Sequence, residues 1–238
     1  MNIEVIGTAQ QVTEGQVRNK TVVVVDVLRA TSVMVTALHN GATGVIPVLS
    51  PEEAFALRDQ LPHVVLGGER NAEPITGFDY GNSPLSYTTD VVKGQTLVMT
   101  TTNGTLAIQN AMAAKELVVA AFINDKAVSH YLQEKQDVVF VCSGNNGLYT
   151  LEDALCVGRI IYLLKQINDR VKLSDFALSL EQLYASKVNN LLELAMQGHH
   201  YQVLDAKGYH PDLEYCFRSD MTQIIPIWDG QVLKNISR

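Results

Sequence analysis

A run of four valines, followed at once by an aspartate and soon by an arginine, constrains the fold more than any other feature. It lies in the segment VVVVDVLRATS over residues 22–32. Continuous β-branched residues are typical of a strand covered on both faces, as in a parallel or mixed sheet. The hydroxyl residues Thr31 and Ser32 are typical of a first helical turn, whose free N–H groups attract anions. We therefore predict a strand over 22–25, a turn carrying Asp26 and Arg29, and a helix to about residue 40.

Two interpretations of this turn are open. Asp26 and Arg29 can form a structural ion pair beside the helix, or they can begin a ligand site. The second interpretation rests on the frequency with which strand-to-helix turns of α/β proteins bind ligands.

The remaining chain alternates short apolar runs with helical patterns, as α/β proteins do. A hairpin is predicted at the end because Asp229-Gly230 separates two apolar runs. We predict a single domain over residues 1–238, a three-layer α/β/α fold with a mixed, largely parallel sheet and a helical C-terminal part able to fold over a cleft. The predicted strands are 3–6, 22–25, 44–49, 63–66, 95–100, 116–122, 137–142, 224–228 and 231–236; the predicted helices are 30–40, 51–61, 106–114, 125–133, 150–165 and the segments after 175.

Composition narrows the function. The chain of 238 residues is 47% hydrophobic and has a formal net charge of −7, which argues against non-specific binding to nucleic acid or to a membrane surface. It begins in a strand-like segment, so we expect a cytoplasmic protein. The cysteines Cys142, Cys156 and Cys216 are too widely spaced for a disulfide framework or a zinc motif, and Cys142 is expected to be a small buried apolar residue. A homodimer is the default expectation for such a protein.

Polar residues follow several predicted strands where helices begin. Because carboxyl ends of neighbouring parallel strands share one edge of a sheet, we expect these turns to converge on one cleft. A long loop over 71–90, rich in Gly, Pro and Asn, is also expected to be functional. The candidates are Asp26, Arg29, Glu69, Arg70, Asp79, Asn82, Thr101, Thr102, Asn103, Ser143, Asn145, Glu152 and Asp153.

The chemistry of these candidates favours a metal-bound anion. Carboxylate and amide oxygens are hard ligands that suit Mg²⁺, and arginine side chains bind phosphate and other oxyanions through paired N–H groups. No histidine is expected at the centre of the site, because His39, His63 and His130 lie away from the turns and His199-His200 falls in the helical C-terminal part. The dinucleotide fingerprint and the phosphate-binding P-loop are both absent from the sequence.

Structural alternatives stand beside some candidates. Glu152 and Asp153 can simply be acids of a first helical turn that Thr150 caps. Asp79 and Asn82 can hold turns through bonds from their side chains to the backbone.

Taken together, the motifs resemble the 2-phosphosulfolactate phosphatase family, enzymes associated with coenzyme M biosynthesis. The resemblance is carried by VVVVDVLRATS, LGGER, GFDYGNSP, TTTNGT, CSGNNG and LEDA, which follow one another in this order. It extends from about Val22 to Gly158 and more weakly to Pro226.

Membership would imply an α/β enzyme that uses Mg²⁺ to hydrolyse 2-phospho-3-sulfolactate, a small anionic substrate, to 3-sulfolactate and phosphate. On this resemblance Asp26 is a metal ligand or the nucleophile, and Glu69 a metal ligand or the base. Arg29 and the residues after it, Thr31 and Ser32, would bind phosphate, and Arg70 would clamp an oxyanion. The remaining assignments are Thr102, Asn103 and Gly104 to the carboxylate or sulfonate, Asn82, Ser143 and Asn145 to further substrate contacts, and Glu152 and Asp153 to the metal.

Other functions remain possible at this stage. Asn71 and Glu73 follow Arg70, and an added acid there would weaken sulfonate binding, so another phosphorylated hydroxy acid is an alternative substrate. A non-catalytic anion sensor, or a lyase that acts on a polyanionic acid, would use the same turns.

Overall fold

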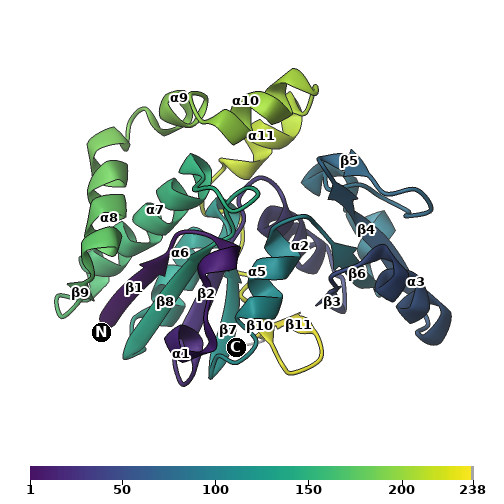
Figure 1. Ribbon diagram of the computed structural model, residues 1–238, viewed down its shortest axis with the longest axis horizontal. Coiled ribbons are helices and arrows are strands. Elements are labelled where there is room, and N and C mark those ends of the chain that lie inside the picture. Colours follow the sequence, from purple (N-terminus) through teal and green to yellow (C-terminus); the bar gives the residue numbers. More distant parts are fainter. Residues whose placement is uncertain (237–238) are drawn as a thin grey trace.

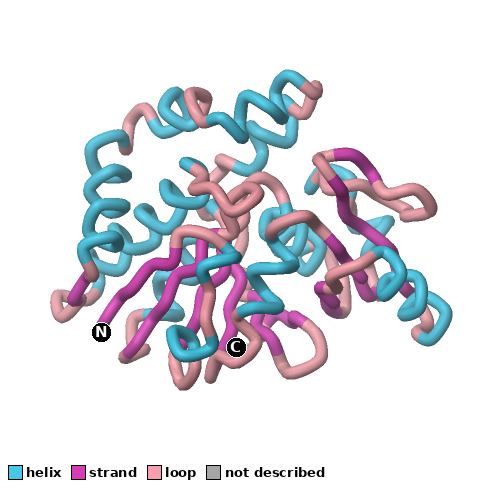
Figure 2. Tube along the Cα trace, in the orientation of Figure 1, coloured by secondary structure: helices cyan, strands magenta, loops and turns pink. Residues whose placement is uncertain are grey.

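The computed structural model describes residues 1–236 and confirms the predicted α/β class. One eleven-stranded sheet runs in the order β5-β4-β6-β3-β11-β10-β7-β2-β8-β1-β9. Figure 2 shows strands and helices alternating along most of the chain. The strands are β1 Asn2–Ile6, β2 Thr21–Val25, β3 Gly44–Pro47, β4 Val64–Arg70, β5 Glu73–Pro74, β6 Thr96–Thr100, β7 Glu116–Ala120, β8 Asp137–Cys142, β9 Lys172–Leu173, β10 Pro226–Trp228 and β11 Leu233–Asn235.

Helices cover both faces of this sheet. Three short 3₁₀ turns accompany them, at Ala9–Gln11, Pro84–Ser86 and Phe122–Asn124. No helix within residues 1–236 is long and apolar enough to cross a lipid bilayer. The helices are α1 Glu14–Val17, α2 Ala30–His39, α3 Pro51–Gln60, α4 Thr89–Val92, α5 Gly104–Asn110, α6 Asp125–Leu132, α7 Leu151–Ile167, α8 Asp175–Lys187, α9 Leu191–Ala195, α10 His199–Ala206 and α11 His210–Cys216.

The valine run forms β2, which lies inside the sheet as predicted. It pairs in parallel with β7 on one side and β8 on the other, so that Val25 is opposite Ala120 and Cys142. Its side chains alternate between two apolar clusters on the opposite faces of the sheet, with Val23 and Val25 in one and Val22 and Val24 in the other. Burial of each valine stabilises the fold by about 1.5–3 kcal/mol.

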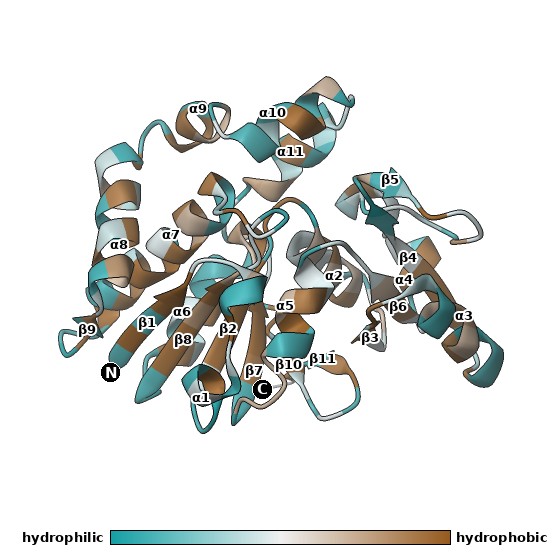
Figure 3. Cartoon of the chain, viewed as in Figure 1, coloured by the Kyte–Doolittle hydropathy of each residue, from teal (hydrophilic) through white to brown (hydrophobic). Residues whose placement is uncertain are grey.

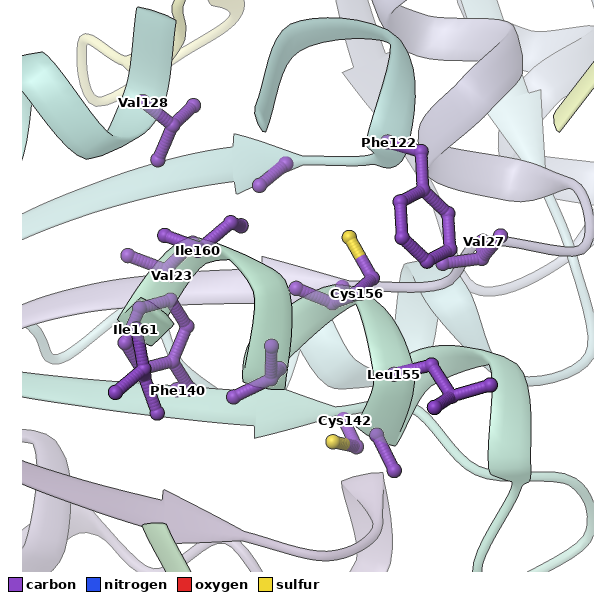
Figure 4. Packing of buried hydrophobic residues seen from close by; sticks show 14 of the residues in the cluster. Val23, Val27, Phe122, Val128, Phe140, Cys142, Leu155, Cys156, Ile160 and Ile161 are labelled. Carbon is purple, nitrogen blue, oxygen red and sulfur yellow. The ribbon is translucent and has the colours of Figure 1, made fainter. Parts of the chain in front are cut away.

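The first apolar cluster lies between the sheet and α6 and α7. Figure 4 shows Val23 and Phe140 of the sheet beside Ile160 and Ile161 of α7, with the thiol of Cys156 among them. Cys142 is also fully buried there, as predicted. The opposite face packs against α2 and α5, and Figure 3 shows that the central strands are mostly hydrophobic.

The terminal hairpin has an unexpected position in the sheet. Its strands β10 and β11 pair with each other as predicted, but they lie between β7 and β3 rather than at an edge. Each outer pairing has a single residue pair, Ile227 with Val118 and Leu233 with Val45. The hairpin therefore joins two blocks of parallel strands, which Figure 1 shows on the left (β7, β2, β8, β1) and the right (β3, β6, β4).

These two blocks run in opposite senses along the hydrogen-bonded sheet. The pairings of β3 with β11, of β11 with β10 and of β10 with β7 are all antiparallel, and three reversals leave β3 opposed to β7. Parallel pairing therefore explains why strand ends meet within each block, but it does not explain why the ends of the two blocks meet. Twist and the connecting loops must bring the two blocks together at the site.

Several predicted boundaries are corrected. The predicted strand over 63–66 is wrong at its end, since β4 continues to Arg70 and places Glu69 and Arg70 within the strand. Gly68 allows this because its φ of +141° and its approach to β6 suit only glycine; a Cβ there would lie 1.9 Å from the carbonyl oxygen of Thr100. Helix α5 begins at Gly104 and ends at Asn110, earlier than predicted. The long loop contains β5, a 3₁₀ turn and α4.

The helical C-terminal part folds over the carboxyl ends of several strands. After α8 packs along α7, the segment α9–α11, which we call the C-terminal arm, crosses the top of the molecule in Figure 1. The arm is anchored by Tyr201, Leu204, Leu213 and Cys216, all buried in the same apolar cluster as Val23. This arrangement places residues far apart in sequence around one cavity.

Candidate functional site

A cavity of about 200 Å³ lies where the ends of β2, β4, β6 and β8 meet the C-terminal arm. Its wall is dominated by short polar side chains, among them five asparagines and two threonines. Only two carboxylates and two basic side chains line it. The lining residues are Asp26, Leu28, Arg29, Glu69, Asn71, Ala72, Asn82, Thr101, Thr102, Asn103, Asn145, Asn146, His200, Val203 and Leu204.

The structure therefore brings together at one cavity half of the candidates named from the sequence. The cavity is lined by Asp26, Arg29, Glu69, Asn82, Thr101, Thr102, Asn103 and Asn145. The candidates that do not line it are Thr31, Ser32, Arg70, Asp79, Gly104, Ser143, Glu152 and Asp153.

The hydroxyls after Arg29 shape the turn. Thr31 Oγ1 accepts a hydrogen bond from the Asp26 N–H (3.1 Å) and donates one to the Asp26 carbonyl (2.8 Å). Ser32 Oγ donates to the carbonyl of Val27 at 2.9 Å. These bonds fix the backbone of the turn between β2 and α2. The Leu28–Arg29 peptide bond in this turn is cis. Because both hydroxyls already serve the turn, their contribution to the site is to hold Asp26 in place.

Asp26 is the most perturbed acid at the cavity. Burial raises its pKa to about 6 from the usual 3.8, although a hydrogen bond from Ser143 and the charge of His200 lower it. The neighbouring charges of Glu69 and Glu152 raise it further. Gly104 allows this packing, because a Cβ there would lie 2.7 Å from Asp26 Oδ2. A buried carboxylate with this pKa is typical of a functional site.

Glu69 connects the ends of two strands. Its Oε1 accepts from the Thr102 N–H (2.7 Å), while its Oε2 accepts from the Ala72 N–H (2.7 Å) and the Thr102 hydroxyl (3.2 Å). Arg70, its neighbour, points elsewhere: its guanidinium donates to the carbonyls of Glu69 and Leu49 and to Thr100 Oγ1. Of the two arginines considered from the sequence, only Arg29 lines the cavity.

Asp153 and Glu152 behave differently from each other. Asp153 accepts hydrogen bonds from the backbone N–H groups of Val27 and Gly144 and from the hydroxyls of Ser143 and Thr150. It thereby connects the turns after β2 and β8. Burial and the charges of Asp26 and Glu152 raise its pKa well above the usual range. Glu152, 2% exposed, instead contacts a histidine.

That histidine is His200, and the prediction that no histidine belongs to the centre of the site is wrong. Its Nδ1 lies 2.6 Å from Glu152 Oε1, and its ring lines the cavity. Burial lowers the pKa of His200, but the hydrogen bond and charge of Glu152, with the charges of Asp26 and Asp153, raise it above the usual value overall. No motif in the sequence marks this residue, because α10 brings it to the cavity from the C-terminal arm.

Arg29 does not pair with Asp26, so the first interpretation of the turn is wrong in its choice of partner. Its Nη1 donates to Asp212 Oδ2 of α11 at 2.8 Å.

Asp79 does hold a loop, as the structural alternative predicted, since its carboxylate accepts from the Leu66 N–H and from Arg58. Asn82, in contrast, lines the cavity, and its buried Oδ1 has no hydrogen-bond partner among residues 1–236.

Two further asparagines were missed from the sequence. Asn71 and Asn146 have positive φ values of 54° and 51°, a conformation that asparagine tolerates better than most residues. Asn103 Oδ1 accepts from the Asn146 N–H at 3.0 Å, and Asn103 Nδ2 donates to Asn145 Oδ1 at 3.4 Å. These bonds connect the turn after β6 with the turn after β8. The paired asparagines of SGNNG were the available signal for Asn146, and no comparable pattern marks Asn71 in GERNA.

The donor set is compatible with a hydrated Mg²⁺ ion. Within residues 1–236, no three side chains of His, Cys, Asp or Glu form a group able to hold a metal ion by themselves. Mg²⁺ in proteins usually binds one or two carboxylates and keeps waters or substrate oxygens as its other ligands. Asp26 and Glu69, both at the cavity, supply that number.

The fold and the cavity define an α/β protein with a polar small-molecule site where strands end. A model of one family, 2-phosphosulpholactate phosphatase, matches residues 6–231. A protein of Clostridium novyi (strain NT), named "Probable 2-phosphosulfolactate phosphatase", is 44% identical over 95% of this chain and 96% of its own length. A protein of Clostridium tetani (strain Massachusetts / E88) with the same name is 41% identical over 98% of this chain and 100% of its own.

The chain therefore belongs to the 2-phosphosulfolactate phosphatase family, a family of phosphoric monoester hydrolases. The resemblance seen in the motifs from Val22 onward is confirmed.

Proposed function

We propose that the protein uses Mg²⁺ to hydrolyse 2-phospho-3-sulfolactate to 3-sulfolactate and phosphate. The observation that carries the proposal is Asp26, a buried carboxylate with a raised pKa at a cavity otherwise rich in neutral donors. Membership of the family supports the substrate, and the mixture of amides, hydroxyls and one arginine supports a ligand with several oxyanion groups.

The metal would be held by Asp26 and Glu69. Glu152 and Asp153, which the sequence also suggested, do not line the cavity; Glu152 contacts His200, and Asp153 accepts hydrogen bonds from two strand-end turns. When bound, Mg²⁺ would neutralise phosphoryl charge and polarise the ester. Thr102 and the asparagines of the turns after β6 and β8 would hold the carboxylate and sulfonate of the substrate. These groups would be bound by neutral hydrogen-bond donors rather than by additional basic side chains.

Protein groups would perform the proton chemistry. Asp26, when ionised, is placed to act on the phosphoryl group, as nucleophile or as the ligand that fixes the metal. His200 is the only imidazole lining the cavity in the described part of the chain, and Glu152 fixes its orientation through Nδ1. Its other nitrogen, Nε2, would protonate the ester oxygen that leaves with sulfolactate.

The test is phosphate release by the wild type and by Asp26→Asn. Wild-type protein with Mg²⁺ should release phosphate from 2-phospho-3-sulfolactate faster than from other phosphorylated hydroxy acids. Asp26→Asn should lower kcat at least about a hundredfold, because the amide neither attacks phosphorus nor neutralises a cation. Asp137→Asn, at the exposed start of β8, is the matched control and should retain wild-type rates.

Three outcomes would each contradict one part of the proposal. Absence of phosphate release by the wild type from every substrate in the panel would favour a non-catalytic anion-binding protein. Full turnover by Asp26→Asn would leave the phosphatase activity intact but remove Asp26 from its chemistry. A preference for another phosphorylated hydroxy acid would change the substrate alone.

The proposed setting is the cytoplasm, with the product entering coenzyme M biosynthesis. We infer a homodimer, since two-fold assembly is the commonest state of small enzymes. Light scattering of the purified chain should give a mass of about twice 26.2 kDa; a value equal to one chain would overturn this part.

A further inference from the structure

Arg29 is held in an unusual way for a residue at a substrate cavity. Its side chain is 2% exposed, yet it lines the cavity. Nη1 donates to Asp212, Nη2 makes a long contact of 3.5 Å with the Ala72 carbonyl, and Nε has no hydrogen-bond partner within the part of the chain that the structure describes. The guanidinium carbon lies 3.8 Å from the centre of the Tyr209 ring. Of the three guanidinium nitrogens, Nη1 is thus firmly bonded, Nη2 weakly and Nε not at all among the described residues.

Asp212 is itself fixed in place. It is 4% exposed, and its two oxygens have different partners, Arg29 through Oδ2 and the Ser83 hydroxyl through Oδ1 at 2.6 Å. Tyr209, on the same arm, donates from its hydroxyl to the Ala72 carbonyl at 2.8 Å. We call Arg29, Asp212, Ser83, Tyr209 and Ala72 the arginine clamp. It connects the turn after β2, the long loop and the C-terminal arm.

The arginine clamp determines which edge of the guanidinium remains free. Arginine binds phosphate and carboxylate through two parallel N–H groups. Asp212 occupies Nη1, so the available pair is Nε and Nη2, which lie along one side of the guanidinium. A buried donor without an acceptor costs about 1–3 kcal/mol. An oxyanion at this edge would supply the missing acceptor.

We propose that Asp212 is a positioning residue that holds Arg29 so that its Nε–Nη2 edge binds the phosphoryl group. The choice of the phosphoryl group follows from Asp26, which stands three residues earlier in the same turn, and this step rests on the proposed function. Asp212 acts only through Arg29. The C-terminal arm thereby completes a phosphate site that β2 begins.

Substitutions at Asp212 separate positioning from simple charge neutralisation. Asp212→Ala removes both hydrogen bonds and should lower kcat for 2-phospho-3-sulfolactate about a hundredfold. Asp212→Asn loses the charge but keeps an oxygen for Arg29 and a polar partner for Ser83, so it should lose about tenfold. Ser83→Ala should lose a few-fold. Glu214→Gln, on the exposed side of the same helix, is the matched control and should match the wild type.

Charge neutralisation alone predicts the opposite result. If Asp212 only weakens the attraction of Arg29 for anions, Asp212→Asn lowers KM and leaves kcat unchanged, and this outcome overturns the proposal. So does a kcat within twofold of the wild type in folded Asp212→Ala. Should Asp212→Ala fail to fold, Asp212→Asn and Ser83→Ala carry the same test.

Binding of inorganic phosphate distinguishes this proposal from the proposed function. Calorimetric titration should show wild-type protein and Glu214→Gln binding phosphate equally, and Asp212→Ala at least tenfold more weakly. If this holds but no substrate is hydrolysed, the proposed function fails and the role of Asp212 stands. If hydrolysis is observed and the clamp variants match the wild type in kcat and phosphate affinity, the role of Asp212 fails alone. If the wild type neither binds phosphate nor hydrolyses any substrate, both the proposed function and the role of Asp212 fail.

Discussion

At the scale of single residues, the site places its acids under unequal constraints. Asp153 accepts four hydrogen bonds and Glu69 three, so their carboxylates are fixed by neighbouring turns. Asp26 is buried with fewer hydrogen bonds to its carboxylate, and burial is the largest cause of its raised pKa. A carboxylate kept in this state costs stability, as is common for functional residues.

This cost predicts a stability that depends on pH. The pKa of Asp26 is about 6 in the fold, against 3.8 without it. The stability that its protonated form contributes is complete below about pH 3.8 and is lost as the pH rises through about 6. Asp26→Asn, neutral throughout, should therefore be more stable than the wild type at pH 7.5 by up to about 3 kcal/mol. The gain should vanish near pH 4.

Urea unfolding in the presence of EDTA, from pH 4 to pH 7.5, measures this difference without interference from a bound cation. Asp137→Asn again serves as the control, since its side chain is exposed. A wild type more stable than Asp26→Asn at pH 7.5 would contradict the prediction.

At the scale of elements, β4 and β6 are joined more closely than their sequences suggest. Gly68 packs against the backbone of Thr100, which lets β4 continue far enough to place Glu69 beside Thr102. The sequence pattern placed the end of β4 at Gly67-Gly68, because paired glycines usually end a strand. Here the glycines permit close approach of two backbones.

Gly68→Ala tests this packing. The added methyl would collide with the Thr100 carbonyl at a positive φ, so we expect a loss of more than about 2 kcal/mol in the free energy of unfolding. Gly15→Ala is the matched control, since a Cβ there meets no atom within 4 Å and Gly15 lies in α1. Unfolding of both variants in urea decides the matter, and equal stability of Gly68→Ala and Gly15→Ala would sink the interpretation.

At the scale of the whole molecule, the last residues described complete the centre of the sheet. The hairpin β10–β11 joins two blocks that, within residues 1–236, have no other pairing with each other. The cavity lies between side chains from both blocks, so its shape depends on this junction. The pairings of the hairpin with β7 and β3 join residues far apart in the sequence, and such contacts are expected to form late in folding.

Leu233→Ala should expose this dependence. Leu233 is fully buried and pairs with Val45, so its truncation should lower the free energy of unfolding by about 2–5 kcal/mol. Lys234→Ala, the exposed neighbour, should change it by less than about 1 kcal/mol. Hydrogen exchange in Leu233→Ala should show weaker protection in β3 and β7 together. Weakened protection confined to the hairpin would contradict a junction between the blocks.

Much of the fold could be predicted because local patterns determine it. The valine run predicted a central strand, and Ser50-Pro51 predicted the start of α3, where Ser50 accepts from the Glu53 N–H. Parallel pairing of β2 with β8 explains why Asp26 and Asn145, which follow these two strands, line the same cavity. Turn chemistry also identified the acids, although it could not show which of them would face the cavity.

Burial periodicity and turn chemistry act over a few residues, and they were enough to predict the α/β class, the order of the strands along the chain and the family motifs that begin at Asp26. The folded chain was needed to show that the hairpin divides the sheet, that His200 and Asp212 join the site, and that Arg70 lies outside the cavity lining. These outcomes depend on contacts across 48 and 183 residues of chain, for Glu152 with His200 and Arg29 with Asp212. Such contacts form only when packing of the C-terminal arm brings opposite charges together in the interior. The sequence near each residue does not show which partner it will meet.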